Sequence, residues 1–258
     1  MATAPESQYS TDRNLRARQR LWQRQDPAFD VVSWTLELAG LTPDSLVLDV
    51  GCGNGRYLAA MRARSVEAVG CDLSLGILPA DPDGRVVAAE AAALPFPCEQ
   101  FDVVLAPHML YHVSDPGAAA IEFDRVLRPG GCCVVVANGA GHLASLRAVV
   151  HRAAADIQPG WRWTDHLGDV FSLENGADQL SVAFGDVRCV RPEVPGRAVV
   201  TDPEVVAGYV DSVADIYGTE LIGSWDNLVK DVRSRVAAII QRDGAFEVEG
   251  DVGAFICR

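Results

Sequence analysis

The sequence has little positive charge and almost no lysine. Its 258 residues include 22 lysines and arginines against 35 acidic residues, for a formal net charge of −13, and Lys230 is the single lysine. Such a surface repels polyanions, so the composition argues against a nucleic-acid partner. The densest basic stretch, "DRNLRARQRLWQR", spreads its arginines over more than one face of a helix, as a solvated helix does.

The sequence also lacks an apolar run long enough to span a bilayer, and it begins with the polar stretch "MATAPESQYSTDR". Its seven cysteines show no Cys-x-x-Cys spacing, which favours reduced thiols over disulfides or a zinc site. Hydrophobic residues make up 49% of the chain, enough for a large buried core. We therefore expect a cytoplasmic protein that does not interact with membranes.

Apolar strands and helices alternate regularly through the first half of the chain. The predicted strands cover residues 45–51, 67–74, 85–91, 101–108 and 132–138. One intervening helix has clear limits, with Asp115 as N-cap, Pro116 in its first turn and Gly130 near its end. This alternation predicts an α/β fold, with a parallel sheet covered by helices on both faces.

The rest of the chain breaks this rhythm. Residues 11–41 are expected to be helical, further helices are expected after residue 138, and residues 246–258 read as a terminal strand. We expect one domain over residues 1–258. Within it we expect an N-terminal helical cap at 1–41, a core at 42–138, a cap insertion at 139–183, and the remaining sheet and helices at 184–258.

Three glycines, Gly51, Gly53 and Gly55, directly follow the first predicted strand. Ligands of open α/β sheets bind at the carboxyl ends of the strands, where glycine lets a ligand approach the backbone. A dinucleotide fingerprint would need glycine at the position of Arg56. The carboxylate of Asp49, just before the turn, would repel a phosphate but would suit a cationic amino group. The turn therefore favours a phosphate-free cofactor that carries an ammonium.

The stretch "LDVGCGNGRYL" resembles motif I of the class I S-adenosylmethionine-dependent methyltransferases. The resemblance continues in the family's order through "AVGCDLS", "AEAAALPFPCEQFDVVLAPHMLYHVSDP" and "EFDRVLRPGGCCVVVAN", which ends at residue 138. The two flanking caps are similar to those of methyltransferase type 11-like, bacterial small-molecule enzymes. The resemblance implies a Rossmann-like, mostly parallel seven-stranded sheet with an antiparallel C-terminal strand and helical cap segments.

The resemblance also implies S-adenosylmethionine as cofactor and S-adenosylhomocysteine as product. Asp72, at the end of the second strand, is expected to bind the ribose hydroxyls. Glu90 stands where the family usually has an aspartate that reaches the adenine, and it either makes this contact or is a solvated surface residue. The other expected cofactor contacts, besides Asp49 and the three glycines, are Cys52, Asn54, Leu73, Ala91, Pro107 and Tyr9.

The implied reaction is an in-line displacement in which the protein mainly holds donor and acceptor together. A base is needed only where the attacking atom must lose a proton. His108, Tyr111 and His112 follow the fourth strand and are the candidate catalytic residues, because histidine accepts protons near neutral pH. They could instead serve packing. The spacing of the two histidines also fits a metal, but no third ligand accompanies them, so no metal is expected.

The acceptor is expected to contact cap residues, and the candidates are His142, Trp22, Trp163 and Phe171. Aromatic walls suit a small, partly apolar molecule. The aromatic rings could instead anchor the caps to the core, and His142 could be an exposed residue at the start of a helix. Residues 11–24 are expected to close over the site as a lid that the core does not need for stability.

The leading hypothesis is a methyltransferase acting on a small molecule, with secondary metabolism as a possible setting, as a monomer or homodimer. Two alternatives stay open. One is a nucleic-acid or protein methyltransferase, which the acidic composition disfavours for RNA. The other is a protein that binds S-adenosylmethionine without transferring its methyl group, because the glycine turn reports binding alone.

Overall fold

The alternating strands form a seven-stranded sheet in the order β3-β2-β1-β4-β5-β9-β6. The computed structural model describes residues 12–74, 76–77, 85–161, 163, 166–194, 196–217 and 224–258. The strands of the sheet are β1 (Leu46–Val50), β2 (Glu67–Asp72), β3 (Val86–Ala88), β4 (Phe101–Pro107), β5 (Leu127–Asn138), β6 (Val187–Val190) and β9 (Val252–Cys257). Strands β1 to β5 are parallel, and β9 runs antiparallel between β5 and β6. The mostly parallel sheet with an antiparallel C-terminal strand is thereby confirmed.

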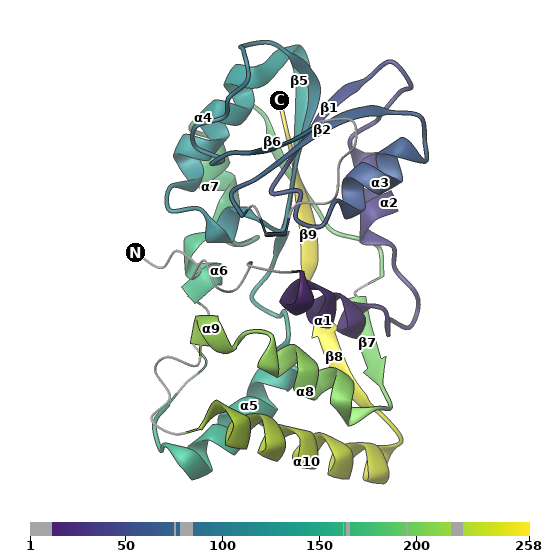
Figure 1. Ribbon diagram of the computed structural model, residues 1–258, viewed down its shortest axis with the longest axis vertical. Coiled ribbons are helices and arrows are strands. Elements are labelled where there is room, and N and C mark those ends of the chain that lie inside the picture. Colours follow the sequence, from purple (N-terminus) through teal and green to yellow (C-terminus); the bar gives the residue numbers. More distant parts are fainter. Residues whose placement is uncertain are drawn as a thin grey trace.

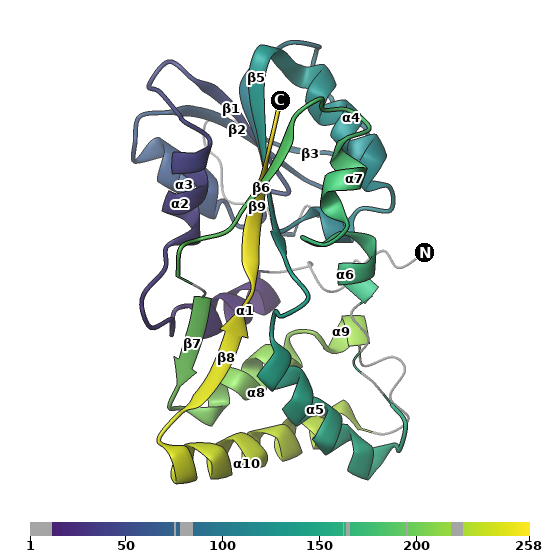
Figure 2. The same ribbon diagram turned by 180° about the vertical axis from the view of Figure 1, so that it is seen from behind.

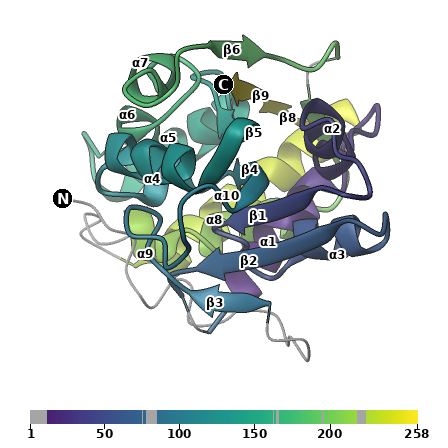
Figure 3. The same ribbon diagram turned by 90° about the horizontal axis from the view of Figure 1, so that it is seen from above.

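The inner strands are apolar on both faces because helices cover both sides of the sheet. On one face lie α2 (Val31–Leu38) and α3 (Arg56–Arg62), and on the other lie α4 (Pro116–Val126) and α7 (Gly176–Leu180), as Figure 3 shows from above. Helix α4 starts as predicted, with the Asp115 carboxylate accepting a hydrogen bond from Ala118 N. These elements and the sheet form the sheet lobe.

A second lobe, the cap lobe, lies below the sheet lobe in Figures 1 and 2. It consists of α1 (Arg13–Trp22), α5 (Ala144–Ile157), α8 (Pro203–Asp211), α9 (Ala214–Tyr217), α10 (Trp225–Asp243) and the antiparallel pair β7 (Gly196–Val200) and β8 (Phe246–Gly250). It has a hydrophobic core of its own, in which Leu146, Val210 and Leu228 are fully buried. The cap lobe therefore has its own apolar interior, drawn from segments far apart in the sequence.

The cap lobe includes more of the chain than the insertion expected at residues 139–183. It also contains β7, α8, α9, α10 and β8, which were expected to complete the sheet lobe. The chain returns to the sheet lobe at β9, which directly follows β8. Conversely, α7 from within the expected insertion packs on the sheet lobe, where Leu180 is buried beside α4. The short helix α6 (His166–Val170) lies between the lobes (Figure 1).

The expected helix at residues 11–41 is two helices in the structure. The chain turns between α1 and α2, where Gln25 forms an isolated bridge with Ala198 of β7 and the Asp30 carboxylate caps α2 by accepting from Val32 N. Helix α1 is part of the cap lobe, and its Leu21 is fully buried in the core of that lobe. The expectation that the sheet core does not need this segment stays a prediction, but Leu21 makes the segment a packed part of the cap lobe.

No helix in the described part of the chain has the length and apolar character that crossing a membrane requires.

Candidate functional site

The glycine turn after β1 adopts a backbone that other residues rarely accept. Gly51, Gly53 and Gly55 have φ angles of +69°, +54° and +79°. The turn is tied to β2 because Gly51 N and Cys52 N donate to Cys71 O at 2.8 and 2.9 Å. A Cβ atom at Gly51 would lie 2.6 Å from Met109 Cβ, so a side chain there would displace the segment that follows β4.

Asp49 lies at the end of β1 and is fully buried. Neither of its carboxylate oxygens has a hydrogen-bond partner among the described residues. Burial, with a smaller effect of nearby Asp72, raises its pKa well above the usual value. A buried, unpaired carboxyl of this kind fits a cationic ligand group, which would supply the missing charge.

Asp72 closes the same site from the end of β2. Its carboxylate accepts hydrogen bonds from Gly53 N and Ser74 N, both at 2.9 Å, so the side chain is held beside the glycine turn. The next residue, Leu73, is 72% exposed, which is unusual for leucine and leaves an apolar surface that a flat ring could cover. Glu90 is exposed and Ala91 buried, just beyond β3. These residues share the carboxyl edge of the sheet.

The remaining residues that were expected to contact the cofactor differ in their burial and position. Cys52 is buried, and its Sγ lies near Gly70 of β2, so this side chain packs behind the turn. Asn54 is a partly buried turn residue, and Pro107 is the buried last residue of β4. Tyr9 lies outside the described residues.

Two of the candidate catalytic residues, His108 and His112, have pKa values well below that of free histidine. His108 has a left-handed backbone with φ of +56°, an uncommon conformation that tends to occur at functional sites. Burial, with a smaller effect of Arg56, lowers its pKa to about 4. Tyr111 and His112 lie in the 3-10 helix η2 (Leu110–His112), with ring centroids 4.6 Å apart. Burial and then Arg18 lower the pKa of His112 to about 3. Both imidazoles are therefore neutral near pH 7.

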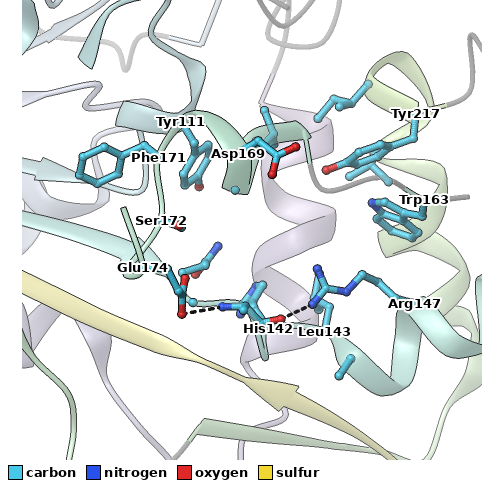
Figure 4. Close-up of a pocket in the computed structure, with 18 of the residues that line it drawn as sticks. Tyr111, His142, Leu143, Arg147, Trp163, Asp169, Phe171, Ser172, Glu174 and Tyr217 are labelled. Carbon is cyan, nitrogen blue, oxygen red and sulfur yellow. Dashed lines mark hydrogen bonds between the residues drawn. The ribbon is translucent and has the colours of Figure 1, made fainter. Parts of the chain in front are cut away.

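A cavity of about 840 Å³ lies between the sheet lobe and the cap lobe, beyond η2. Figure 4 shows residues from both lobes around it. Its described lining includes Arg18, Tyr111, His112, Asn138, His142, Arg147, His151, Trp163, Asp169, Phe171, Glu174, Tyr209 and Tyr217. This volume is in the range of small-molecule sites, and the mixture of aromatic rings with a few polar groups is typical of them.

Three of the four candidate acceptor residues line this cavity, namely His142, Trp163 and Phe171. Phe171 is 1% exposed and packs against Phe255, so most of its surface belongs to the core of the sheet lobe. Trp22 is not among the lining residues that the structure describes. It stacks on the His142 ring at 5.0 Å between centroids, so it supports the cavity wall from behind.

Helix α1 touches both parts of the site. The Leu15 side chain would be 3.4 Å from a Cβ atom at Gly53, so it lies against the glycine turn, while Arg18 lines the cavity. That residues 11–24 close over the site as a lid stays a prediction, and Leu21 also makes the helix a structural part of the cap lobe.

Several residues of the cavity wall were not predicted from the sequence. Asn138 could have been found, because it ends the fifth strand and therefore lies at the ligand-binding edge of the sheet. Arg147 and Tyr217 come from cap helices, and Asp169 from α6, whose placement no local pattern reveals. In the described part of the chain, no group of three or more His, Cys, Asp or Glu side chains is arranged to hold a metal ion.

Residues 48–135 match the family described as a methyltransferase domain. A demethylmenaquinone methyltransferase of Beutenbergia cavernae is 37% identical over 120 residues, which cover 45% of this chain and 46% of that protein. A ubiquinone biosynthesis O-methyltransferase of Pseudomonas fluorescens is 36% identical over 129 residues, covering 43% and 55%. These alignments thus span about half the length of the curated relatives.

Residues 48–135 therefore form a methyltransferase domain of the class I S-adenosylmethionine-dependent type. Solved structures agree with this fold. A putative methyltransferase from an antibiotic biosynthesis pathway of Anabaena variabilis has a TM-score of 0.65 at 15% identity, with 88% of this chain and 96% of that one covered. A phosphoethanolamine N-methyltransferase of Haemonchus contortus, solved with S-adenosylmethionine, has a TM-score of 0.52 at 19% identity, with 88% and 51% covered.

The residues at the carboxyl edge of the sheet fit the family's cofactor, S-adenosylmethionine. The cofactor carries an ammonium, and Asp49 is a buried carboxyl without a described partner. It carries ribose hydroxyls, and the Asp72 carboxylate is held at the end of the neighbouring strand. It carries an adenine, and Leu73 exposes an apolar surface beside Asp72. All three features lie next to the glycine turn that the family uses.

Proposed function

We propose that the protein methylates a small-molecule acceptor bound in the cavity between the two lobes. The observation that carries this proposal is the position of the cavity. Tyr111 and His112 of η2 line it, and η2 directly follows Met109, which packs on the glycine turn. Arg18 of α1 also lines the cavity, and Leu15 of the same helix lies against that turn. A molecule in the cavity would therefore lie beside the cofactor-binding turn.

When bound, S-adenosylmethionine supplies an activated methyl group on a positively charged sulfur. The chain's part is to bind and orient. Asp49 would pair with the ammonium and Asp72 with the ribose hydroxyls, while the cap lobe and α1 would exclude water from the reacting groups. A neutral His108 or His142 would accept a hydrogen bond from an acceptor hydroxyl or amine.

The cavity favours a small, partly aromatic acceptor. Its wall contains the rings of Tyr111, Trp163 and Tyr217, and its volume of about 840 Å³ suits a molecule of drug-like size. The relatives named for quinone biosynthesis make a hydroxylated aromatic acceptor a reasonable class to test first. A role in secondary metabolism belongs to the same proposal, as does a cytoplasmic location, which the seven free thiols support.

The test is incubation of the protein with methyl-labelled S-adenosylmethionine and an extract of small metabolites, followed by mass spectrometry. We expect a labelled product heavier than its precursor by one methylene. Label found instead in added RNA or protein would favour a macromolecular acceptor. Tight binding of S-adenosylhomocysteine by calorimetry, with no labelled product from any extract, would favour binding without methyl transfer.

A further inference from the structure

The loop at residues 139–143 joins the sheet lobe to the cap lobe and carries His142 into the cavity wall. Such a connection is usually among the more mobile parts of a protein. Here every backbone N–H from residue 139 to residue 145 has a hydrogen-bond partner. Two bonds are local, from His142 N to Gly139 O and from Ala144 N to Gly141 O. The other partners come from distant parts of the chain.

Three acidic residues provide these distant partners. Ala140 N donates to Glu174 Oε1 at 3.1 Å, and Gly141 N donates to Asp251 Oδ2 at 3.0 Å. Gly139 N donates to the backbone oxygen of Asp251 at 3.0 Å.

The last of these residues, Glu249, holds the end of the loop. Leu143 N donates to its backbone oxygen at 2.9 Å, and Ser145 N donates to its Oε2 at 2.8 Å. The Ser145 hydroxyl donates to the other carboxylate oxygen, Oε1. Figure 4 shows Glu174 on one side of this segment and Arg147, which donates to Ala140 O at 2.6 Å, on the other. The loop is therefore held by backbone hydrogen bonds along its whole length.

The loop is also held in a strained shape. Leu143 has a φ angle of +60°, an uncommon conformation for a residue other than glycine, and such strain persists only where the surrounding contacts fix it. A Cβ atom at Gly139 would lie 2.3 Å from Asp251 Oδ2, so the carboxylate closes directly onto the backbone. Strain and dense hydrogen bonding together indicate a segment whose exact position matters for function.

The loop places the uncharged imidazole ring of His142 in the cavity wall. Burial, with smaller effects of His108 and Arg147, lowers the pKa of His142 to about 3, so its imidazole is neutral and always has one nitrogen free to accept a hydrogen bond. The ring is stacked on Trp22 at an interplanar angle of 29°, which fixes its plane. Among the described residues, His142 Nδ1 and Asn138 Oδ1 are buried in the cavity wall without a hydrogen-bond partner. Because both atoms belong to residues that line one cavity, a molecule bound there could supply the missing hydrogen bonds.

We propose that Glu174, Glu249 and Asp251 are positioning residues of the acceptor site, which hold the loop so that His142 and Asn138 accept hydrogen bonds from a hydroxyl or amine of the acceptor. This inference rests on the proposed function and gives the acceptor a chemical class. The acceptor carries at least one O–H or N–H group that can donate to these two atoms. A molecule without a donor would leave the two buried atoms unpaired and would bind more weakly.

The positioning role is tested with Glu249→Gln, and Glu247→Gln is the matched control. Glu247 lies two residues earlier on β8 and pairs with the exposed Arg197, away from the loop. With the acceptor identified from the metabolite extract, we expect Glu249→Gln to raise its KM about tenfold. The affinity for S-adenosylhomocysteine should change less than about twofold, and Glu247→Gln should change neither value.

Equal effects of the two variants on KM would overturn the proposal. So would a loss of cofactor affinity in Glu249→Gln as large as its rise in KM. If Glu249→Gln does not fold, Ser145→Ala removes one hydrogen bond to the same carboxylate and provides the same comparison.

The donor requirement is tested with two probes, catechol and its dimethyl ether. Binding to the protein saturated with S-adenosylhomocysteine is followed by ligand-observed NMR. We expect catechol to bind several-fold more tightly than the ether in the wild type and in His142→Gln, which keeps a hydrogen-bond acceptor. The preference should become smaller in His142→Leu, which keeps the volume but leaves Asn138 as the one remaining acceptor of the proposed pair.

An equal preference in all three proteins, or no preference in the wild type, would overturn the assignment. A failure of the proposed function gives a different result. In that case the catechol preference would persist while no labelled product forms from any extract.

Discussion

On the cofactor side, Asp49 is a buried carboxyl without a described partner, whereas the acceptor cavity is lined by His112 and His142, two histidines with lowered pKa values. Burial causes both effects, because it disfavours the charged form of either group. The consequences differ. A carboxyl regains its charge when a cation binds beside it, so we expect Asp49 to pair with the ammonium of the cofactor. The imidazoles stay uncharged and offer hydrogen bonding without charge. In the proposed function, the cofactor is thus recognised by charge and the acceptor by hydrogen bonds.

The largest expected effect comes from Asp49→Asn, which removes the charge and keeps the shape. We expect the affinity for S-adenosylhomocysteine to fall about ten- to a hundredfold, since a hydrogen bond to a charged group contributes about 1.5–3 kcal/mol. Calorimetry measures this loss. The control is Asp124→Asn, an exposed position on α4. Unchanged affinity in Asp49→Asn would show that the ammonium is bound elsewhere.

In the cofactor-free protein, by contrast, we expect Asp49→Asn to increase the stability of the fold. The folded-state pKa of Asp49 is raised above the usual 3.8, so its contribution to stability is complete below pH 3.8. That contribution is lost as the pH rises through the folded-state pKa. We therefore expect the cofactor-free Asp49→Asn variant to melt at a higher temperature than the wild type at pH 8. A lower melting temperature would mean that the carboxylate has a stabilising partner.

The next prediction compares two acidic residues at the carboxyl edge of the sheet, Asp72 and Glu90. Asp72→Ala removes a carboxylate that two backbone amides hold beside the glycine turn, and we expect it to weaken cofactor binding about tenfold or more. Glu90→Ala removes an exposed side chain and should cost much less. Both affinities are measured by calorimetry with S-adenosylhomocysteine. Similar losses in the two variants would show that Glu90 makes a contact of comparable strength.

On the acceptor side, Gly139→Ala tests how tightly the loop is held. The added Cβ would expel the Asp251 carboxylate and break its bond to Gly141 N, which should destabilise the protein by about 1–3 kcal/mol. Gly185→Ala is the control, because nothing lies within 4 Å of a Cβ atom there, and it should change stability by less than about 0.5 kcal/mol. Urea unfolding gives both values. Equal stabilities would mean that the loop can shift freely.

The last prediction concerns pH. The folded-state pKa values of His108, His112 and His142 lie near 3 to 4, below the usual 6.5, so their contribution to stability is present above pH 6.5 and is lost as the pH falls toward 4. Each histidine can contribute at most about 1.4 kcal/mol per pH unit. Urea unfolding at pH 7 and pH 5 should show this fall, and it should be smaller in His112→Gln. An equal fall in that variant would contradict the neutral state of this ring.

The cofactor side and the acceptor side of the site differ in how much of each could be predicted from the sequence. Strands β1 to β5 and the positions of Asp49 and Asp72 follow from local patterns, because each strand end and turn is set by a few neighbouring residues. The cap lobe has no such pattern, since Leu21, Leu146 and Val248 meet from distant segments. Residues 246–258 looked like one strand, yet they form β8 and β9, with Asp251 between them held to the 139–143 loop. That break depends on a contact 110 residues away.

The continuity of β8 and β9 limits how this protein can be re-engineered. Strand β8 pairs with β7 in the cap lobe, and after a single residue the chain continues into β9, between β5 and β6 of the main sheet. The cap lobe is therefore not an exchangeable module with one point of attachment. Transplanting acceptor specificity into a related enzyme would require α1, α5 and the segment from β7 to β8 to move together, with the main sheet re-joined at each junction.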